Sequence, residues 1–148
     1  MKKKIIIAVS FVLVLAIVFV TLIFYDRSGL IIQAYNEYGY TVTEKILEET
    51  TLNYYLSDLS DKQLEQAADY KIVYFRLPGG NITASGTILI CPNSLDAIEF
   101  LKMSDNGLYE EMREKRKIKG NCILFTNNYS VIDTFNDYLY IVIIGLFN

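Results

Sequence analysis

An uninterrupted apolar run near the start of the chain constrains its fold more than any other feature. The run extends from Ile5 to Phe24 (24 − 5 + 1 = 20 residues) and contains no charged side chain. A helix of this length, at about 1.5 Å per residue, matches the roughly 30 Å hydrocarbon core of a bilayer. Because the run is apolar on every face of such a helix, we expect a transmembrane segment at residues 5–25 rather than the core helix of a soluble protein.

Two other kinds of apolar leader fit the sequence less well. A cleaved signal peptide has a shorter apolar core, of about 7–15 residues, followed by small residues at the cleavage site. Here the longer run ends in Leu22, Ile23, Phe24 and Tyr25. A lipoprotein signal needs a cysteine directly after the core, but the first cysteine of the chain is Cys91. We therefore interpret the run as a permanent signal anchor.

The basic residues that flank the run predict its orientation. Lys2, Lys3 and Lys4 precede it, whereas Arg27 is the nearest basic residue after it. Lysine and arginine close to a membrane segment remain on the cytoplasmic side. We expect a single-pass protein of the cell membrane, with residues 1–4 as a cytoplasmic tail and the C-terminal domain outside. The lipid bilayer is thus the first expected partner.

Composition limits the chemistry available to the rest of the chain. The 124 residues after the run (148 − 24) suffice for one domain, and they carry 11 basic against 17 acidic side chains, a net charge of −6. An acidic surface argues against nucleic-acid binding. With no histidine and only two cysteines, the usual serine or cysteine hydrolase triads and an all-cysteine metal site are excluded. We expect no catalytic residues, no metal and no cofactor.

Three helices are expected between the apolar run and the first strand. Apolar residues at three- and four-residue spacing, followed by Gly39, predict a juxtamembrane helix within residues 26–40. Its polar side lacks the lysine and arginine of interfacial helices, so we favour packing on the domain over a position in the membrane interface. Thr41–Glu44 and Ser60–Gln63 have the form of capping boxes. Each predicts the start of a helix, the first of which would bury Ile46, Leu47, Thr50, Tyr54 and Tyr55.

A hairpin follows these helices. Residues 70–77 and 82–91 are rich in β-branched and aromatic residues, and Pro78–Asn81 supplies the residue types of a turn between them. Gly86, in the middle of the second strand, indicates a bulge or a close backbone approach.

Helices and strands alternate in the remaining chain. We expect a helix capped by Asn93 or Ser94 with Leu95 facing inward, a helix over 108–119, a strand over 121–126 and a short helix capped by Ser130. Residues 138–147 are interpreted as a buried fourth strand, with a continued helix as the alternative. The long helical connection favours a parallel pairing of strands 82–91 and 121–126. The predicted fold is an α+β domain over residues 41–148, with two leading helices and a mixed sheet of about four strands.

This parallel pairing would place two polar loops at one edge of the sheet. Helix N-termini at such an edge can bind a small anionic ligand. The competing interpretation, that these residues only cap helices and form turns, is the stronger one. The parallel arrangement would also separate Cys91 from Cys122, so we expect no disulfide and two free thiols. The candidate ligand-binding residues are Asn93, Ser94, Thr126, Asn127, Asn128 and Ser130.

Taken together, these patterns favour protein interaction as the function. We expect an anchored extracytoplasmic module that binds another membrane or envelope protein, for example as an accessory subunit of a complex. Binding of a small anionic ligand is the alternative, and an enzyme is the least favoured class. Tyrosine is enriched at protein interfaces, and the candidate partner-binding residues are Tyr35, Tyr38, Tyr40, Tyr54 and Tyr55.

Overall fold

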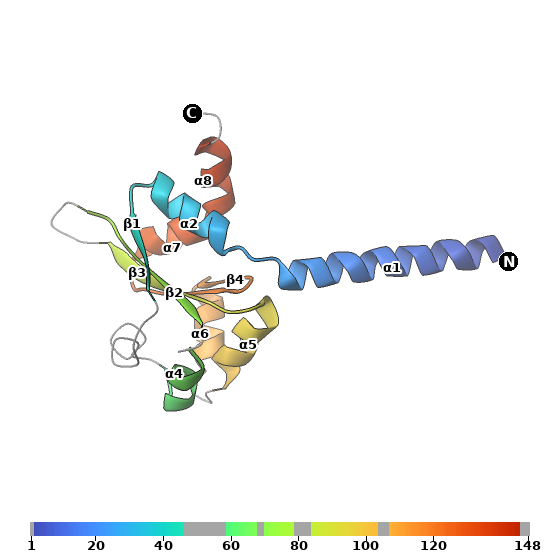
Figure 1. Cartoon of the computed structure of the whole chain (residues 1–148), viewed down its shortest axis with the longest axis horizontal. Coiled ribbons are helices and arrows are strands. Elements are labelled where there is room, and N and C mark those ends of the chain that lie inside the picture. The colour runs from blue at the N-terminus through green and yellow to red at the C-terminus, as the bar shows by residue number, and fades with distance from the viewer. Residues whose placement is uncertain (1, 46–58, 68–69, 79–83, 104–106, 146–148) are drawn as a thin grey trace.

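The computed structural model describes residues 2–45, 59–67, 70–78, 84–103 and 107–145. A long helix, α1 (Lys2–Phe24), projects from a domain that surrounds an antiparallel sheet (Figure 1). The other helices described are α2 (Ser28–Glu37), α4 (Asp61–Ala67), α5 (Ser94–Lys102), α6 (Leu108–Glu114), α7 (Tyr129–Asn136) and α8 (Tyr138–Gly145). The strands are β1 (Thr41–Lys45), β2 (Lys71–Arg76), β3 (Ser85–Ile90), β4 (Ile118–Lys119) and β5 (Cys122–Phe125).

The predicted α+β class is confirmed, but the sheet differs from the expected one. It has five strands in the order β1-β2-β3-β5-β4, and all neighbouring pairs are antiparallel. The β2–β3 hairpin is confirmed. At Gly86, where a bulge or a close backbone approach was expected, the close neighbour is a side chain, because a Cβ atom there would lie 2.8 Å from Cζ of Phe75.

The parallel pairing of the strands now numbered β3 and β5 was wrong. Ile90 lies opposite Cys122 and Thr87 opposite Phe125, which is an antiparallel register. The sequence prediction missed the two-residue strand β4, which turns into β5 through Gly120 and Asn121. The φ angle of Gly120 is 59°, as a tight hairpin with glycine first in its loop requires. The long helical connection therefore links β3 to β4, which run in the same direction, and β5 lies between them.

Two other predicted elements have a different secondary structure. Thr41–Glu44 belongs to strand β1 and does not cap a helix, because its β-branched residues pair with β2, with Val42 opposite Phe75. The helix expected after it, which includes Tyr54 and Tyr55, lies outside the described residues. Residues 138–145 form helix α8 rather than a fourth strand, which was the alternative interpretation. The Ile141 N–H donates to the carbonyl oxygen of Asp137 at 3.0 Å, so the segment satisfies its backbone without a sheet partner.

Three predicted helix caps can be compared with the structure. The Ser60 N–H donates to Oε1 of Gln63 at 3.0 Å, as a capping box requires. Asn93 caps α5, but Leu95 is 50% exposed and does not face inward. Asn128 caps α7 in place of Ser130.

The sheet separates two hydrophobic cores. Helices α2, α7 and α8 cover one face, and α4, α5 and α6 cover the other (Figure 1). Neighbouring residues of one strand belong to different cores, as with Ile72 and Val73 in β2, because side chains alternate across a sheet. Helix α2 contributes Ile31, Ala34 and Tyr35, each at most 1% exposed, to the first core. It packs on the domain, as the sequence analysis favoured.

Candidate functional site

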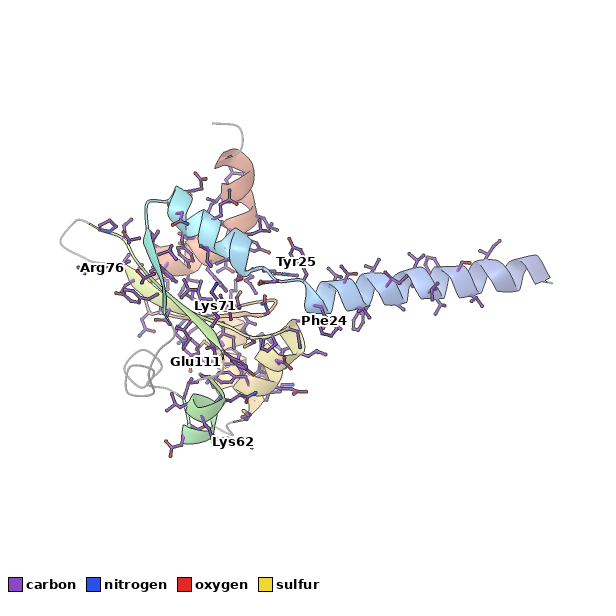
Figure 2. All side chains as sticks on the ribbon, in the orientation of Figure 1. Phe24, Tyr25, Lys62, Lys71, Arg76 and Glu111 are labelled. Atoms are coloured by element: carbon purple, nitrogen blue, oxygen red, sulfur yellow. The ribbon has the colours of Figure 1, made fainter. Side chains whose placement is uncertain are left out.

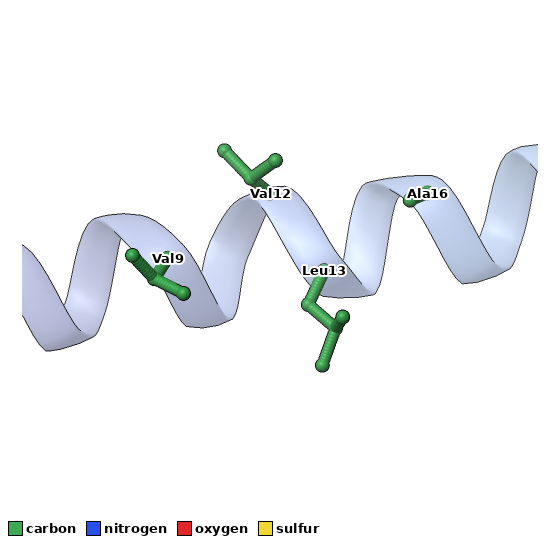
Figure 3. A pocket seen from close by; sticks show the side chains of 4 residues that line it. All are labelled: Val9, Val12, Leu13 and Ala16. Atoms are coloured by element: carbon green, nitrogen blue, oxygen red, sulfur yellow. The ribbon is translucent and has the colours of Figure 1, made fainter.

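Most of the exposed large apolar side chains among the described residues lie on α1. From Ile7 to Phe24 its large aliphatic and aromatic side chains, apart from the half-buried Ile23, are between 49% (Val18) and 68% (Ile7) exposed. Figure 3 shows Val9, Val12, Leu13 and Ala16 on this helix at close range. No single helix among the described residues is long and apolar enough to cross a membrane. Val9–Phe24 and α2, bent by 52° relative to each other, meet the criterion only as a pair, and only by length and composition.

Asn121 fixes the connection between α1 and α2 to the domain. Its side chain is almost fully buried, and the residue is 2% exposed. Oδ1 accepts the Arg27 N–H at 3.1 Å, while Nδ2 donates to Oδ1 of Asp26 at 3.0 Å and to the carbonyl oxygen of Cys91 at 3.1 Å. One side chain thus joins the α1–α2 connection to the end of β3 and the β4–β5 turn.

A second contact holds the end of α1 itself. Ser94 Oγ, in the first residue of α5, donates to the carbonyl oxygen of Ile23 at 3.0 Å. A helix leaves its last four carbonyl groups without partners inside the helix, and this hydroxyl satisfies one of them. Figure 2 labels Phe24 and Tyr25 where α1 meets the domain. We call the residues Asp26, Arg27, Ser94 and Asn121, together with Ile23, the junction.

Asp26 has a pKa below its ordinary value. Partial burial raises the pKa of this carboxyl group, but hydrogen bonds from Ser28 and Asn121 and the positive charge of Lys71 outweigh that effect. The Ser28 N–H donates to Oδ1 of Asp26 at 2.8 Å. The carboxylate therefore accepts the N–H of Ser28, the first residue of α2, and binds Asn121 in its charged form.

The six candidate ligand-binding residues do not form one site. In the antiparallel register, Asn93 and Ser94 follow one end of β3, whereas Thr126 and the α7 cap lie near its other end. Thr126 Oγ1 donates to the carbonyl oxygen of Ser85 at 2.8 Å, and Oδ1 of Asn128 accepts the Val131 N–H at 3.3 Å. The prediction that the two polar loops share one edge of the sheet was wrong, because it depended on the parallel pairing of β3 and β5.

Part of this set lines a shallow surface depression of about 370 Å³. Thr126 and Asn127 border it together with residues of β2 and β3. None of the described residues that line it is a lysine or arginine. The depression therefore lacks the positive charge with which a site would select an anionic ligand.

The candidate tyrosines divide between core and surface. Tyr35 and Tyr40 are 1% and 6% exposed, and the Tyr35 ring stacks on Phe75 with a centroid distance of 4.0 Å. Burial raises the pKa of both hydroxyl groups, and Tyr35 donates to the carbonyl oxygen of Val131 at 2.8 Å. These two side chains are core residues and are not available to a partner. Tyr38 is 58% exposed.

The two cysteines are free and buried, and the strand register explains why. The Cys91 N–H donates to the Asn121 carbonyl oxygen at 2.8 Å, so Cys91 lies opposite Asn121 while Cys122 lies opposite Ile90. Successive side chains alternate between the faces of a sheet, and the two thiols accordingly belong to different cores. A disulfide requires Cβ atoms about 3.5–4.5 Å apart that point toward each other. The antiparallel pairing brings the two backbones together, but the alternation keeps the sulfur atoms apart.

Sequence reasoning did not identify the junction. Asp26 and Asn121 are 95 residues apart, and neither belongs to a recognisable motif. Gly120 gives a local indication of the turn that carries Asn121, because a glycine before a strand predicts a turn. No protein-family model matches the chain, and no curated protein and no solved structure matches it either.

Proposed function

We propose that the chain is a membrane-anchored module that binds another membrane or envelope protein. The supporting observation is the exposed apolar surface of α1. Monomeric soluble proteins rarely leave a continuous apolar surface of this size in water. The 20-residue run from Ile5 to Phe24 has the length of a span. The domain would lie outside the cell, because Lys2, Lys3 and Lys4 outnumber Arg27 beside the span and would keep the N-terminal side in the cytoplasm. Basic residues of the domain that are distant from the span have little effect on orientation.

The junction supports a fixed geometry between anchor and domain. Hydrogen bonds from Asn121 and Ser94 hold the α1–α2 connection and the last turn of α1. The core position of α2 prevents the connection from acting as a loose tether. A domain held in this way presents the same surface at the same height above the membrane, which favours recognition of a neighbouring membrane protein over capture of a soluble ligand.

Helix α8 is the surface best suited to that partner. Its sequence, Tyr138–Gly145, is apolar throughout, and a helix that is apolar on all sides is normally covered on all sides. Tyr138 and Ile141 are buried, but Leu139 and Tyr140 are 51% and 67% exposed. We assign these two side chains, in place of Tyr35 and Tyr40, to contact with an apolar segment of the partner.

The anchor is tested by alkaline carbonate extraction of membranes that contain the full-length protein. We expect the wild-type chain to remain in the pellet. Each arginine near the centre of a span costs about 2.5–3.5 kcal/mol, so a double variant, Leu13→Arg with Ile17→Arg, should move to the supernatant. The matched variant Leu13→Ala with Ile17→Ala should stay in the pellet. Extraction of the wild-type protein would refute the anchor.

The partner is tested by the native mass of the protein after extraction in mild detergent. We expect a stoichiometric second protein to co-purify with the wild-type chain. Leu139→Asp with Tyr140→Asp should release it, whereas Tyr129→Asp, at an 83% exposed position on α7, should not. A wild-type protein that is only a monomer or a homo-oligomer would contradict this part of the proposal.

A further inference from the structure

Three positively charged side chains meet at the junction, and none of them makes an ion pair with a carboxylate of the described residues. Two of them, Arg116 and Lys119, belong to the segment between α6 and β5, and the third, Arg27, belongs to the α1–α2 connection. The described part of the chain contains no ion pair to any of the three. We call these residues the basic cluster. Its members are up to 92 residues apart in sequence (119 − 27).

The backbone of the β4–β5 turn brings the cluster together. The side chain of Arg27 lies across Gly120, where an added Cβ atom would be 2.8 Å from its Cδ and 2.9 Å from its Nε. Lys119 directly precedes this glycine. Arg116, with a φ angle of 54°, lies in the reversal between α6 and β4. Any side chain at position 120 would displace Arg27, so the glycine serves both the turn and the approach of the two segments.

The charges in the cluster repel one another. Partial burial lowers the pKa of Lys119, and the charges of Arg116 and Arg27 lower it further, whereas Asp137 acts in the opposite direction. Asp26, the other nearby acid, is already bound by Ser28 and Asn121. Like charges held close together with few opposite charges favour the binding of an anion.

The position of the cluster identifies the source of that anion. Its member Arg27 follows Phe24 and Tyr25 in the chain, and these two residues are 62% and 47% exposed. Figure 2 labels both where α1 leaves the domain. An anchor that ends at Phe24 would place the cluster at the level of the lipid headgroups. Basic residues near an anionic membrane surface are attracted to it. The chain after residue 24 has a net charge of −6, so an anionic membrane would attract this side of the domain and repel the rest.

From this geometry we infer that Arg27, Arg116 and Lys119 form a binding site for anionic lipid headgroups, which holds the domain against the membrane. The inference depends on the proposed anchor, since α1 brings the cluster to the headgroups. The site explains why, in a net-acidic domain, three cations without an ion pair among the described residues lie at the point where α1 joins it. It also adds to the role of α1, because a span by itself does not select a headgroup.

The test uses native mass spectrometry of the full-length protein in detergent, titrated with phosphatidylglycerol or with phosphatidylcholine of the same acyl chains. Both lipids contact α1 through the same chains, so the ratio of their affinities reports on the headgroup. We expect the wild-type protein to prefer phosphatidylglycerol, and we expect Arg27→Gln with Arg116→Gln and Lys119→Gln to reduce that preference at least fivefold. Raising the salt concentration should weaken the preference as well.

A matched variant and a folding control complete the experiment. Lys62→Gln with Arg76→Gln and Arg113→Gln removes the same charge from positions outside the basic cluster and should leave the preference unchanged. Lys2, Lys3 and Lys4 are present in every protein compared, so their contribution cancels. Unreactive native thiols would show that the cluster variant is folded. Equal preferences in the wild-type and cluster variants would overturn the inference.

The same preparations distinguish the two possible failures. If carbonate extracts the wild-type protein from membranes, the anchor is wrong. If the protein resists extraction but does not prefer phosphatidylglycerol, the anchor stands and the headgroup site is wrong.

Discussion

Asn121 shows how a single buried side chain can connect two parts of a molecule. It satisfies the Arg27 N–H, the Cys91 carbonyl oxygen and one oxygen of Asp26 at the same time. A buried polar group that loses its partner costs more than a typical hydrogen bond contributes. Shortening this side chain therefore leaves two backbone groups without this partner at the base of α1.

We predict that Asn121→Ala lowers the free energy of unfolding of the domain by about 1–3 kcal/mol. Denaturation of the full-length protein in detergent, followed by tyrosine fluorescence, measures this change. Asn127→Ala, at an exposed position near the opposite end of β5, should change the free energy of unfolding by less than about 0.5 kcal/mol. Equal effects of the two substitutions would show that the junction bonds contribute little.

The two thiols provide a second prediction at the residue scale. Burial raises the pKa of Cys91 to about 12 and raises that of Cys122 as well. Because the thiolate is the reactive form, both residues should be inert to a thiol reagent at pH 8 in the folded protein and should react after unfolding. A thiol count of two in denaturant without reductant is expected. A count of zero would reveal the disulfide that the alternation of the strands opposes.

Acidification should weaken the junction. The pKa of Asp26 is lower in the folded protein than its ordinary value, so its contribution to stability is present above that value and disappears as the pH falls through the folded pKa. We predict that Asp26→Asn gives a smaller loss of stability below about pH 4 than the wild-type protein shows. Identical acid denaturation profiles for the two proteins would contradict this role.

At the scale of elements, the structure favours capping over ligand binding for Asn93 and Asn128. Oδ1 of Asn93 accepts the N–H groups of Leu95 and Asp96 at 2.8 and 3.0 Å, and its Nδ2 donates to Asp96 at 2.7 Å. These are the bonds of a helix N-cap, and they use both polar atoms of the side chain.

We predict that Asn93→Ala destabilises the domain by about 0.5–2 kcal/mol and that Asn93→Ser retains most of the stability. The midpoint of chemical denaturation measures both changes. If Asn93→Ala unfolds at the same midpoint as the wild-type protein, Asn93 is not important as a cap.

Local patterns predicted those elements whose structure is determined locally. The β2–β3 hairpin, α5 and α7 follow from turn residues, caps and β-branched runs. The prediction failed where distant partners decide the structure: Thr41–Lys45 joins the edge of β2, and Tyr138–Gly145 packs against α2. Strand β4 has two residues, too few for a periodic pattern, and this omission reversed the predicted direction of β5 relative to β3.

The whole molecule combines an exposed apolar helix, a rigid junction and a domain with two cores. The sequence was sufficient to propose the anchor, because twenty consecutive uncharged residues form a signal that needs no tertiary information. It could not predict the junction or the basic cluster. Both arise only when the β4–β5 turn meets the α1–α2 connection, and no local pattern indicates that contact.

The most direct test of the anchor and its orientation is labelling of introduced cysteines by a membrane-impermeant maleimide. Val14→Cys places a thiol in the middle of α1, Tyr129→Cys places one on the exposed surface of the domain, and the buried native thiols give little background. We predict that Tyr129→Cys is labelled in intact cells, while Val14→Cys stays unlabelled even after the cells are permeabilised. Labelling of Val14→Cys to the same extent as Tyr129→Cys would place α1 in water and contradict the anchor.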